Sequence, residues 1–284
     1  MRTRLALLSL VLVMGASLAA AQGQPRTPNT GDIYCSGLVS NEKIPQESYV
    51  ISGPESYSQA WYSTGETVFI NRGSSNGVKV GDEYLVTRPI TDPSETRWFR
   101  WQLELMEAMG TIWKDIGRIR VVHVRPDVSV AQITYACDPL QRGDYIQAFA
   151  PRPAPPLRND PFDPFAPETR RGDSMVVLSR DFRQTLGQND IIYINAGRAQ
   201  GVNTGDYVRI FRYQASRYWD VYQEPHTAHR LFGLGKTPRP YGWNELPRDI
   251  AGEGIVLRVS ENAATVLITT SKREIQLGYY VELK

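Results

Sequence analysis

Short runs of hydrophobic residues, separated by glycine-containing turns, recur along most of the chain. Val68 to Ile70 alternates apolar and polar faces, and short apolar runs such as Tyr84 to Thr87 and Val128 to Ile133 follow turn residues. Gly81-Asp82 and Gly143-Asp144 are typical of the turns that launch a new strand. The pattern predicts an all-β protein of many short antiparallel strands.

The same pattern occurs twice. Val68 to Arg88 aligns without a gap with Ile192 to Arg212 at an offset of 124 residues, and Gly117 to Ile146 aligns with Gly252 to Val281 at an offset of 135. Such self-similarity predicts a tandem duplication of one unit of roughly a hundred residues. Four or five short strands per unit suit a small antiparallel barrel, because closure removes the exposed strand edges.

The repeated block reads Ile-Asn-x-Gly-x-x-x-Gly-Val-x-x-Gly-Asp in both copies. It resembles the C-terminal domain of the flagellar assembly protein T family and of exported envelope proteins that carry the same block, over most of residues 62–149 and 186–284. The resemblance implies an SH3-like β-barrel in a periplasmic protein that helps to build a ring around the flagellar motor. We therefore expect two tandem SH3-like antiparallel β-barrels, at residues 35–150 and 173–284, joined by a Pro-rich linker at 151–172.

The linker contains an unusual density of proline. Pro151 to Pro167 has seven prolines in seventeen residues, which predicts an extended, semi-rigid connector. A doubled Asp-Pro-Phe occupies residues 160–165. Because two exposed phenylalanines are costly in water, we expect them to dock on a domain of this chain or on a partner.

The N-terminus has the three-part pattern of a cleavable secretory signal peptide. Arginines precede an apolar run from Leu5 to Met14, and small residues end in Ala19-Ala20-Ala21. The run is about ten residues long, whereas a membrane-spanning helix needs about twenty. We predict a signal peptide at 1–21, a flexible leader at 22–34, no membrane-spanning segment after cleavage, and a periplasmic or extracellular location.

Export determines the expected state of the two cysteines. Cys35 and Cys137 would meet an oxidising compartment, where two thiols usually pair. We expect one disulfide, which would close a loop of about a hundred residues and contribute on the order of 4 kcal/mol. The alternative is two buried free thiols.

Composition narrows the possible partners. The 284 residues are 41% hydrophobic and 22% charged, with 32 Lys and Arg against 30 Asp and Glu. Removal of the signal peptide takes away two arginines and no acid, so the mature chain is formally neutral. A neutral chain gives no electrostatic support for binding nucleic acid, and we expect none.

Residues that carry chemistry are sparse. The chain has 3 His and 2 Cys, and it lacks both Gly-x-Ser-x-Gly and His-Glu-x-x-His. His226 and His229, with Glu224 nearby, have no second cluster, so we expect no metal, no cofactor and no catalytic site. A carboxylate pair assembled across space, as in glycoside hydrolases, is the alternative, and it would make the protein a hydrolase of envelope polymers.

Aromatic residues gather in two insertions, Pro89 to Ile116 and Tyr213 to Ala251. The partner-binding residues that we select from them are Trp98, Trp101, Trp219 and Trp243. Exposed aromatic rings anchor protein partners or stack on sugars, whereas the alternative is that they cap the open end of their own barrel. The sequence thus predicts a non-catalytic binding or assembly module of the bacterial cell envelope. Its expected partner is a protein assembly or, as the alternative, peptidoglycan or another cell-wall polysaccharide.

Overall fold

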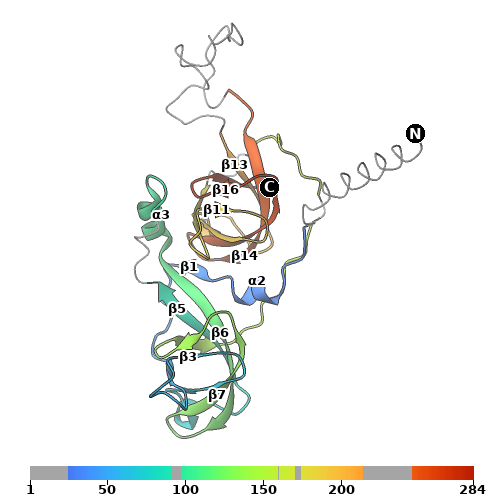
Figure 1. Cartoon of the computed structure of the whole chain (residues 1–284). Helices are drawn as coiled ribbons and strands as arrows, with labels where there is room; N and C mark the ends of the chain where they lie inside the picture. The colour runs from blue at the N-terminus through green and yellow to red at the C-terminus, as the bar shows by residue number, and fades with distance from the viewer. Residues whose placement is uncertain (1–24, 91–96, 159, 170–173, 214–244) are drawn as a thin grey trace, which may run out of the picture.

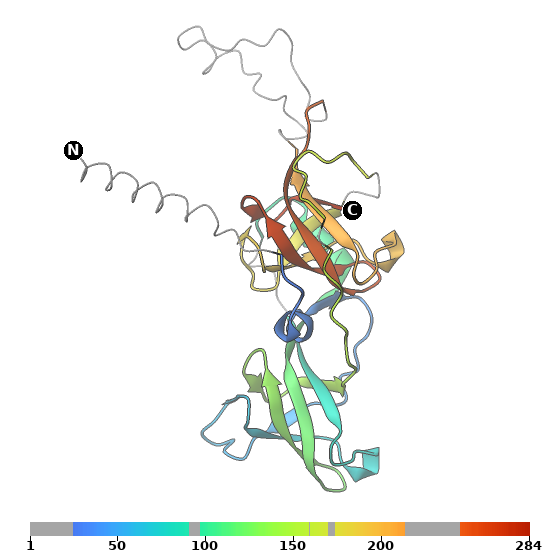
Figure 2. The same ribbon diagram turned by 90° about the vertical axis from the view of Figure 1, so that its right-hand side faces the viewer.

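The computed structural model describes residues 25–90, 97–158, 160–169, 174–213 and 245–284, and these residues form an all-β protein. This confirms the predicted fold class. Two β-structures are stacked along the long axis of the molecule, and strand β6 (Thr111–Val124) rises from the first toward the second (Figures 1 and 2).

The second unit is a closed antiparallel barrel with the strand order β10-β12-β15-β14-β13-β17. Its strands are β10 (Ser174–Ser179), β12 (Ile191–Ile194), β13 (Tyr207–Arg212), β14 (Asp249–Val259), β15 (Ala264–Ser271) and β17 (Tyr280–Leu283). The alternating side chains Ile192, Ile194, Val208 and Ile210 point into its core and are at most 1% exposed. The alternation of faces along each strand thus builds the barrel interior.

The first unit has the strand order β2-β4-β7-β6-β5-β9, and β1 pairs with the start of β6. Its strands are β1 (Leu38–Ser40), β2 (Val50–Ser52), β4 (Thr67–Ile70), β5 (Glu83–Ile90), β7 (Ser129–Ala136) and β9 (Tyr145–Ala148). Tyr49 forms a bridge with Tyr145, and the Val50 N–H donates to the Asp144 carbonyl at 2.8 Å. These contacts join the two ends of the strand order, and we therefore call the two units the first barrel and the second barrel.

The two units share one strand order, element by element. Ile70 pairs with Ser129 as Ile194 pairs with Ala264, so the offsets of 124 and 135 residues preserve the strand register. The remaining short elements also correspond: β3 (Trp61–Tyr62) pairs with β8 (Leu140–Gln141) as β11 (Thr185–Leu186) pairs with β16 (Ile275–Gln276), and the 3-10 turn η2 (Ser74–Asn76) matches η4 (Arg198–Gln200).

Some of the glycines shared by the two units lie where two backbone segments come close together. A Cβ at Gly73 would lie 2.2 Å from the Arg125 carbonyl oxygen, and one at Gly197 would lie 2.3 Å from the Ser260 carbonyl oxygen. No side chain fits at either position, because both loops approach the hairpin of the neighbouring strands at backbone distance. The repeated glycine therefore marks a close packing contact.

The repeated aspartates close turns. The Asp82 carboxylate accepts the Lys79 N–H at 2.9 Å, and the Asp206 carboxylate accepts the Asn203 N–H at 2.8 Å. An aspartate that bonds to its own turn is a common turn stabiliser. Their presence in both units follows from turn geometry.

One ion pair is repeated with its signs exchanged. Lys114 of β6 pairs with Asp138 just beyond β7, whereas Asp249 of β14 pairs with Arg273 just beyond β15 at 2.7 Å. The offset of 135 places Asp249 at the position of Lys114 and Arg273 at that of Asp138. Each unit thus keeps the cross-strand attraction with opposite polarity.

Part of the segment for which the sequence predicts a flexible leader is a short helix, α2 (Thr30–Tyr34). The Asn29 side chain accepts the Asp32 N–H at 2.9 Å, and the Asp32 carboxylate accepts the Asn29 N–H at 2.8 Å, which is a capping box. Ile33 packs against the outside of the second barrel and is 5% exposed. Five residues are too few to show helical periodicity, so the sequence pattern does not reveal this helix.

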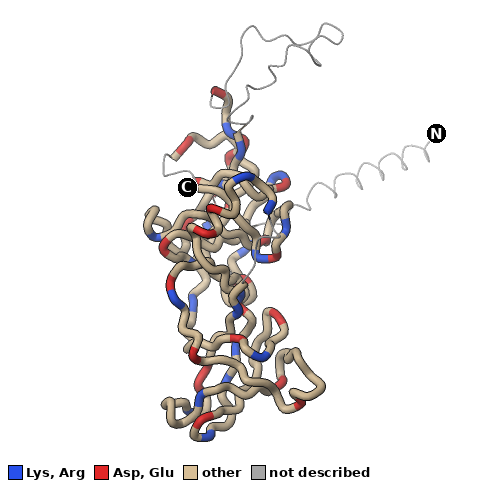
Figure 3. The backbone as a smooth tube through the Cα atoms, turned by 90° about the vertical axis from the view of Figure 1, so that its left-hand side faces the viewer, with Lys and Arg blue, Asp and Glu red and all other residues tan. Residues whose placement is uncertain are grey.

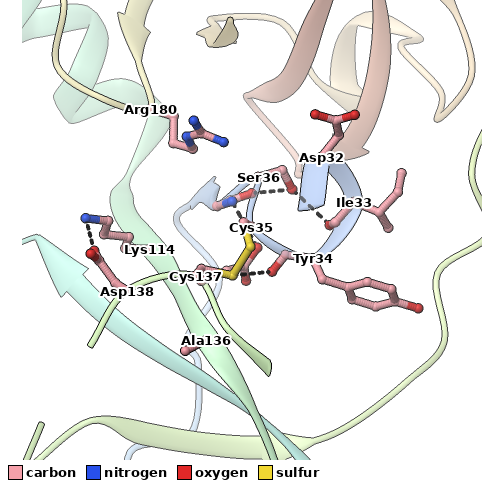
Figure 4. The surroundings of a disulfide bond; sticks show 12 residues. Asp32, Ile33, Tyr34, Cys35, Ser36, Lys114, Ala136, Cys137, Asp138 and Arg180 are labelled. Atoms are coloured by element: carbon pink, nitrogen blue, oxygen red, sulfur yellow. Dashed lines mark hydrogen bonds and ion pairs between the residues drawn. A yellow bond between two sulfur atoms is a disulfide. The ribbon is translucent and has the colours of Figure 1, made fainter. Parts of the chain in front are cut away.

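The predicted disulfide is confirmed. Cys35, at the end of α2, is bonded to Cys137, just beyond β7, with Cα atoms 5.5 Å apart (Figure 4). It attaches the N-terminal segment to the first barrel. No helix among the described residues, including α3 (Gln102–Met109), has the length and apolar character needed to cross a membrane.

The described residues of the Pro-rich connector contain no helix or strand, and several of them contact the second barrel. The Arg158 N–H donates to the Tyr207 hydroxyl at 2.6 Å. Phe162 packs against a cluster that contains the buried Phe211, whereas Phe165 is 67% exposed. One of the two phenylalanines therefore docks within the chain.

Candidate partner-binding surface

Residues 97–109 of the first insertion lie on the second barrel. Met106 and Met109 of α3 are at most 5% exposed and belong to one apolar cluster with Val177 and Tyr193 of the second barrel. Figure 1 shows α3 beside that barrel, connected to the first by β6. The insertion thus braces the neighbouring unit.

Phe99 is an aromatic residue of this insertion that reaches the core of the second barrel. It packs on the core cluster of the second barrel, and its ring lies 3.2 Å from the position that a Cβ on Gly278 would occupy. The alternative that the insertion caps its own barrel is wrong for Phe99. At the equivalent glycine of the first unit, Gly143, a Cβ would meet open space.

Gln102 fixes the segment that carries Phe99. Its fully buried amide donates from Nε2 to the Val177 carbonyl at 2.8 Å, and its Oε1 accepts the Trp98 N–H at 2.6 Å. One side chain therefore links the backbone at Trp98 to strand β10. A buried amide whose oxygen and nitrogen both have hydrogen-bond partners favours a single arrangement of the segments that it joins.

Trp98 and Trp101 face solvent on either side of Phe99. Trp98 is 47% exposed and Trp101 is 55% exposed. Trp101 is the N-cap residue of α3 and has φ of 73° and ψ of 2°, a left-handed conformation that bulky residues rarely adopt. The Arg100 guanidinium lies 4.4 Å from the Trp101 ring centroid, within the range of a cation–π contact.

The other two selected tryptophans, Trp219 and Trp243, lie outside the described residues, as do His226, His229 and the predicted signal peptide. Of the four selected tryptophans, the structure therefore describes Trp98 and Trp101, which lie on one short segment. Trp219 and Trp243 remain predictions from the sequence.

A buried carboxylate holds the two barrels in a fixed relation. Asp115 of β6 is almost completely buried, and it accepts the Gly37 N–H at 2.9 Å and Nη1 of Arg258 from the second barrel at 3.2 Å. Nη1 of Arg152, on the connector, lies 3.8 Å from the same carboxylate. Burial and the neighbouring Arg258 charge lower the pKa of Arg152 to about 10.

Hydroxyl groups of the second barrel complete this joint. The Tyr193 hydroxyl donates to the Ser36 carbonyl at 2.9 Å, and the Ser260 hydroxyl donates to the Val39 carbonyl at 2.6 Å. Burial raises the pKa of Tyr193, which keeps it a neutral donor. Figure 4 shows the residues around Ser36 beside the disulfide. The covalent and hydrogen-bonded anchors of the N-terminal segment are therefore adjacent.

A second aromatic surface, which our reading of the sequence missed, lies on the first barrel. Tyr57 is 89% exposed and Trp61 is 64% exposed, and they line an open pocket of about 440 Å³ together with Gln59, Gln141 and Arg142. Gln59 donates from Nε2 to the Trp61 carbonyl at 2.9 Å. The offset of 124 places Thr185 at the position of Trp61 in the second unit, so an exposed aromatic residue present in one copy alone was the available sequence signal.

The structure also contains a carboxylate pair, as a hydrolase would need. Glu253 and Glu282 lie on either side of Arg209 in neighbouring strands, and they are 6% and 3% exposed. Burial alone would raise the pKa of Glu282, but hydrogen bonds from Arg248 and the Thr169 N–H hold it below its ordinary value. A general acid needs a raised pKa, which Glu282 does not have. Arg209 and Arg248 pair with Glu282, as in a structural ion-pair row.

Among the described residues, neither metal ligands nor the distribution of charge marks a further site. Within the part of the chain that the structure describes, no group of three or more His, Cys, Asp or Glu could hold a metal ion. Lys and Arg are interspersed with Asp and Glu along both barrels (Figure 3). Comparison of the sequence with protein-family models and with curated proteins gives no match.

Proposed function

We propose that this protein is a non-catalytic binding or assembly module of the bacterial cell envelope, which holds a protein partner on Trp98 and Trp101. One observation carries the proposal: two exposed indoles flank a phenylalanine that is locked onto the second barrel. Tryptophan is enriched among the residues that dominate binding energy at protein interfaces. Because the segment is already ordered, binding loses little conformational entropy.

Backbone strain at Trp101 supports the same assignment. A left-handed conformation at a bulky residue costs on the order of 1–3 kcal/mol and persists where surrounding structure enforces it. Here the strained backbone directs the indole ring of Trp101 into solvent, where the ring makes no packing contribution to the core. A partner that covers the ring would account for retaining it.

Export and the envelope location rest on the sequence pattern and the cysteines. A disulfide fits an oxidising compartment, and residues 1–21 have the pattern of a cleavable signal peptide. The resemblance to domains of the flagellar assembly protein T family favours an SH3-like barrel and a periplasmic assembly role.

The pocket at Tyr57 and Trp61 favours a second candidate, binding of peptidoglycan or another polysaccharide. Aromatic faces stack on the C–H faces of sugars, and Gln141 and Arg142 offer hydrogen-bond donors beside them. The two functions use different barrels, so substitutions can separate them.

The test combines crosslinking in the native envelope with substitution of the two indoles. Trp98→Ala with Trp101→Gly removes both rings, and glycine suits the positive φ at position 101. We expect crosslinked partner to fall at least about tenfold, because a pair of hot-spot residues is worth about 2 kcal/mol or more. The melting temperature should not fall, because glycine relieves the strained backbone at position 101.

The matched control is Tyr57→Ala with Trp61→Ala, which removes two exposed aromatics from the first barrel. It should leave protein capture intact. Capture that survives loss of Trp98 and Trp101 would refute the proposal. Retention on purified sacculi that is lost only in the Tyr57 and Trp61 variant would instead establish the polysaccharide function.

A further inference from the structure

The joint between the barrels uses one particular face of the second barrel. The face comprises residues of β12, of the β14–β15 hairpin and of β15: Tyr193, Ser260, Asn262, Ala263 and Thr265. Their polar side chains donate hydrogen bonds to backbone carbonyl groups at residues 36–39 and in α3. Their apolar atoms pack against apolar side chains of β1 and α3. We call this the covered face.

The first barrel has an equivalent face that is open to solvent. The offsets of 124 and 135 place the following residues at the positions of the covered face: Phe69, Arg125, Asp127, Val128 and Val130. The same residues, with Pro126, line an open pocket of about 470 Å³. Phe69 pairs with Val130 across the strands as Tyr193 pairs with Thr265, so the two faces have one geometry. We call this the free face.

The free face replaces the hydroxyl groups of the covered face by apolar and charged side chains. Phe69 stands where Tyr193 has its hydroxyl, Val130 replaces Thr265, and Val128 replaces Ala263. Arg125 replaces Ser260, and Asp127 replaces Asn262. Three hydroxyl donors are thereby lost, apolar surface is gained on the strands, and one charge of each sign is added at the hairpin. Exposed apolar side chains with polar residues beside them are typical of an interaction site.

The second barrel carries the complementary end. In both barrels the paired strands β5–β6 and β13–β14 extend toward the same end of the molecule (Figures 1 and 2). Beside β6 lies β1, where Val39 pairs with Ile112 and also packs on the covered face. Beside β14 lies the connector, where the Ile250 N–H donates to the Pro164 carbonyl at 3.4 Å, next to the exposed Phe165.

We infer that a second copy of this chain docks this end of its second barrel on the free face, so that copies associate head to tail. The occupant is a second copy because the same relation already joins the first barrel to the second inside one chain. That internal contact is heterologous: it joins two different surfaces and, among the described residues, leaves one of each without a partner. Heterologous contacts that do not close on themselves build open chains. The inference uses neither Trp98 nor Trp101 and goes beyond the proposed function.

Sedimentation velocity of the mature chain at increasing concentration tests the association. The average mass should rise beyond that of a dimer. Val128→Arg, which replaces an apolar side chain of the free face by a charged one, should raise the dissociation constant at least about tenfold. Val80→Arg is the matched control, since Val80 is 66% exposed and does not line the pocket. Phe165→Asp alters the opposite end and should weaken association in the same way.

Three results would overturn the inference. One is a monomer at all concentrations up to about 1 mM, where even weak specific contacts are populated. Another is a closed dimer that does not grow further. The third is an equal effect of Val128→Arg and Val80→Arg in variants whose melting temperatures match the parent.

Crosslinking identifies the occupant directly. A photoreactive amino acid at position 128, in a mixture of isotopically light and heavy chains, should give mixed crosslinks to residues 160–169 or 245–250. Crosslinks confined to one chain, or to a different envelope protein, would contradict a second copy as the occupant.

Discussion

Asp115 of the first barrel and Arg258 of the second lie 3.2 Å apart and form a buried ion pair across the joint between the units. The carboxylate also accepts the Gly37 N–H, so each of its oxygens has a partner. A buried charge is tolerated when it is paired and hydrogen-bonded in this way. The pair therefore ties the folding of one unit to the position of the other.

Removal of this carboxylate should weaken both units together. Asp115→Asn leaves the Arg258 guanidinium partly buried without its counter-charge, and we expect a loss of about 3 kcal/mol in the free energy of unfolding. Asp138→Asn is the control, because Lys114 and Asp138 are partly exposed and their pair is worth at most about 1 kcal/mol. Urea denaturation measures both, and equal losses would contradict a special role for Asp115.

Gly37 should be intolerant of any side chain. A Cβ there would lie 2.3 Å from the Tyr193 hydroxyl oxygen, and its φ of +69° is already unfavourable for alanine. Gly37→Ala should separate the barrels, which small-angle scattering would record as an increased radius of gyration. Gly65→Ala is the control, because φ is +92° and the added Cβ meets open space. That variant should lose stability without changing the dimensions of the molecule.

The disulfide should stabilise the chain chiefly by restricting its unfolded state. Replacing Cys35 and Cys137 by serine frees a loop with a sequence separation of 102 residues, and we expect a loss of about 4 kcal/mol. Chemical denaturation of oxidised parent and double variant gives the difference. Reduction of the parent should reproduce it, and a reduced parent as stable as the oxidised one would argue against this role.

Acid should weaken the second barrel through Glu282. Its folded-state pKa is below its ordinary value of 4.5, so its contribution is complete above that pH and is lost as the pH falls through the folded-state pKa. Glu282→Gln should lower stability at neutral pH, and the difference from the parent should shrink on acidification. Urea denaturation between neutral and acidic pH tests this, and a difference that stays constant with pH would exclude Glu282 as the titrating group.

The strands and turns were accessible from the sequence because their causes are local. A glycine at a backbone contact such as Gly73, or an aspartate that closes its own turn such as Asp82, leaves a recognisable residue at a fixed position. The duplication reinforced these signals, because the residue offsets between the two copies also preserve the strand register. Strand β12 pairs with β15 as β4 pairs with β7. The disulfide followed from the number of cysteines and the expected compartment.

The joint between the barrels could not be predicted from the sequence, because its contacts join residues that are distant in the chain and follow no periodic pattern. Tyr193 donates to the carbonyl of Ser36 over a separation of 157 residues, and any residue could supply that carbonyl. Likewise, the sequence marked the first insertion as aromatic, but it did not distinguish the docked Phe99 from the exposed Trp98 and Trp101. That distinction depends on the second barrel, whose Gly278 leaves room for the Phe99 ring.

The sign exchange between the two hairpins also affects how a duplicated chain reaches its folded state. If β6 of the first unit paired with β15 of the second, Lys114 would face Arg273, and the reciprocal error would bring Asp249 beside Asp138. Like charges opposite one another repel, so each incorrect hairpin is penalised and each correct one is favoured. Two halves with the same strand order risk exchanging strands during synthesis, and this polarity helps each half to recognise its own.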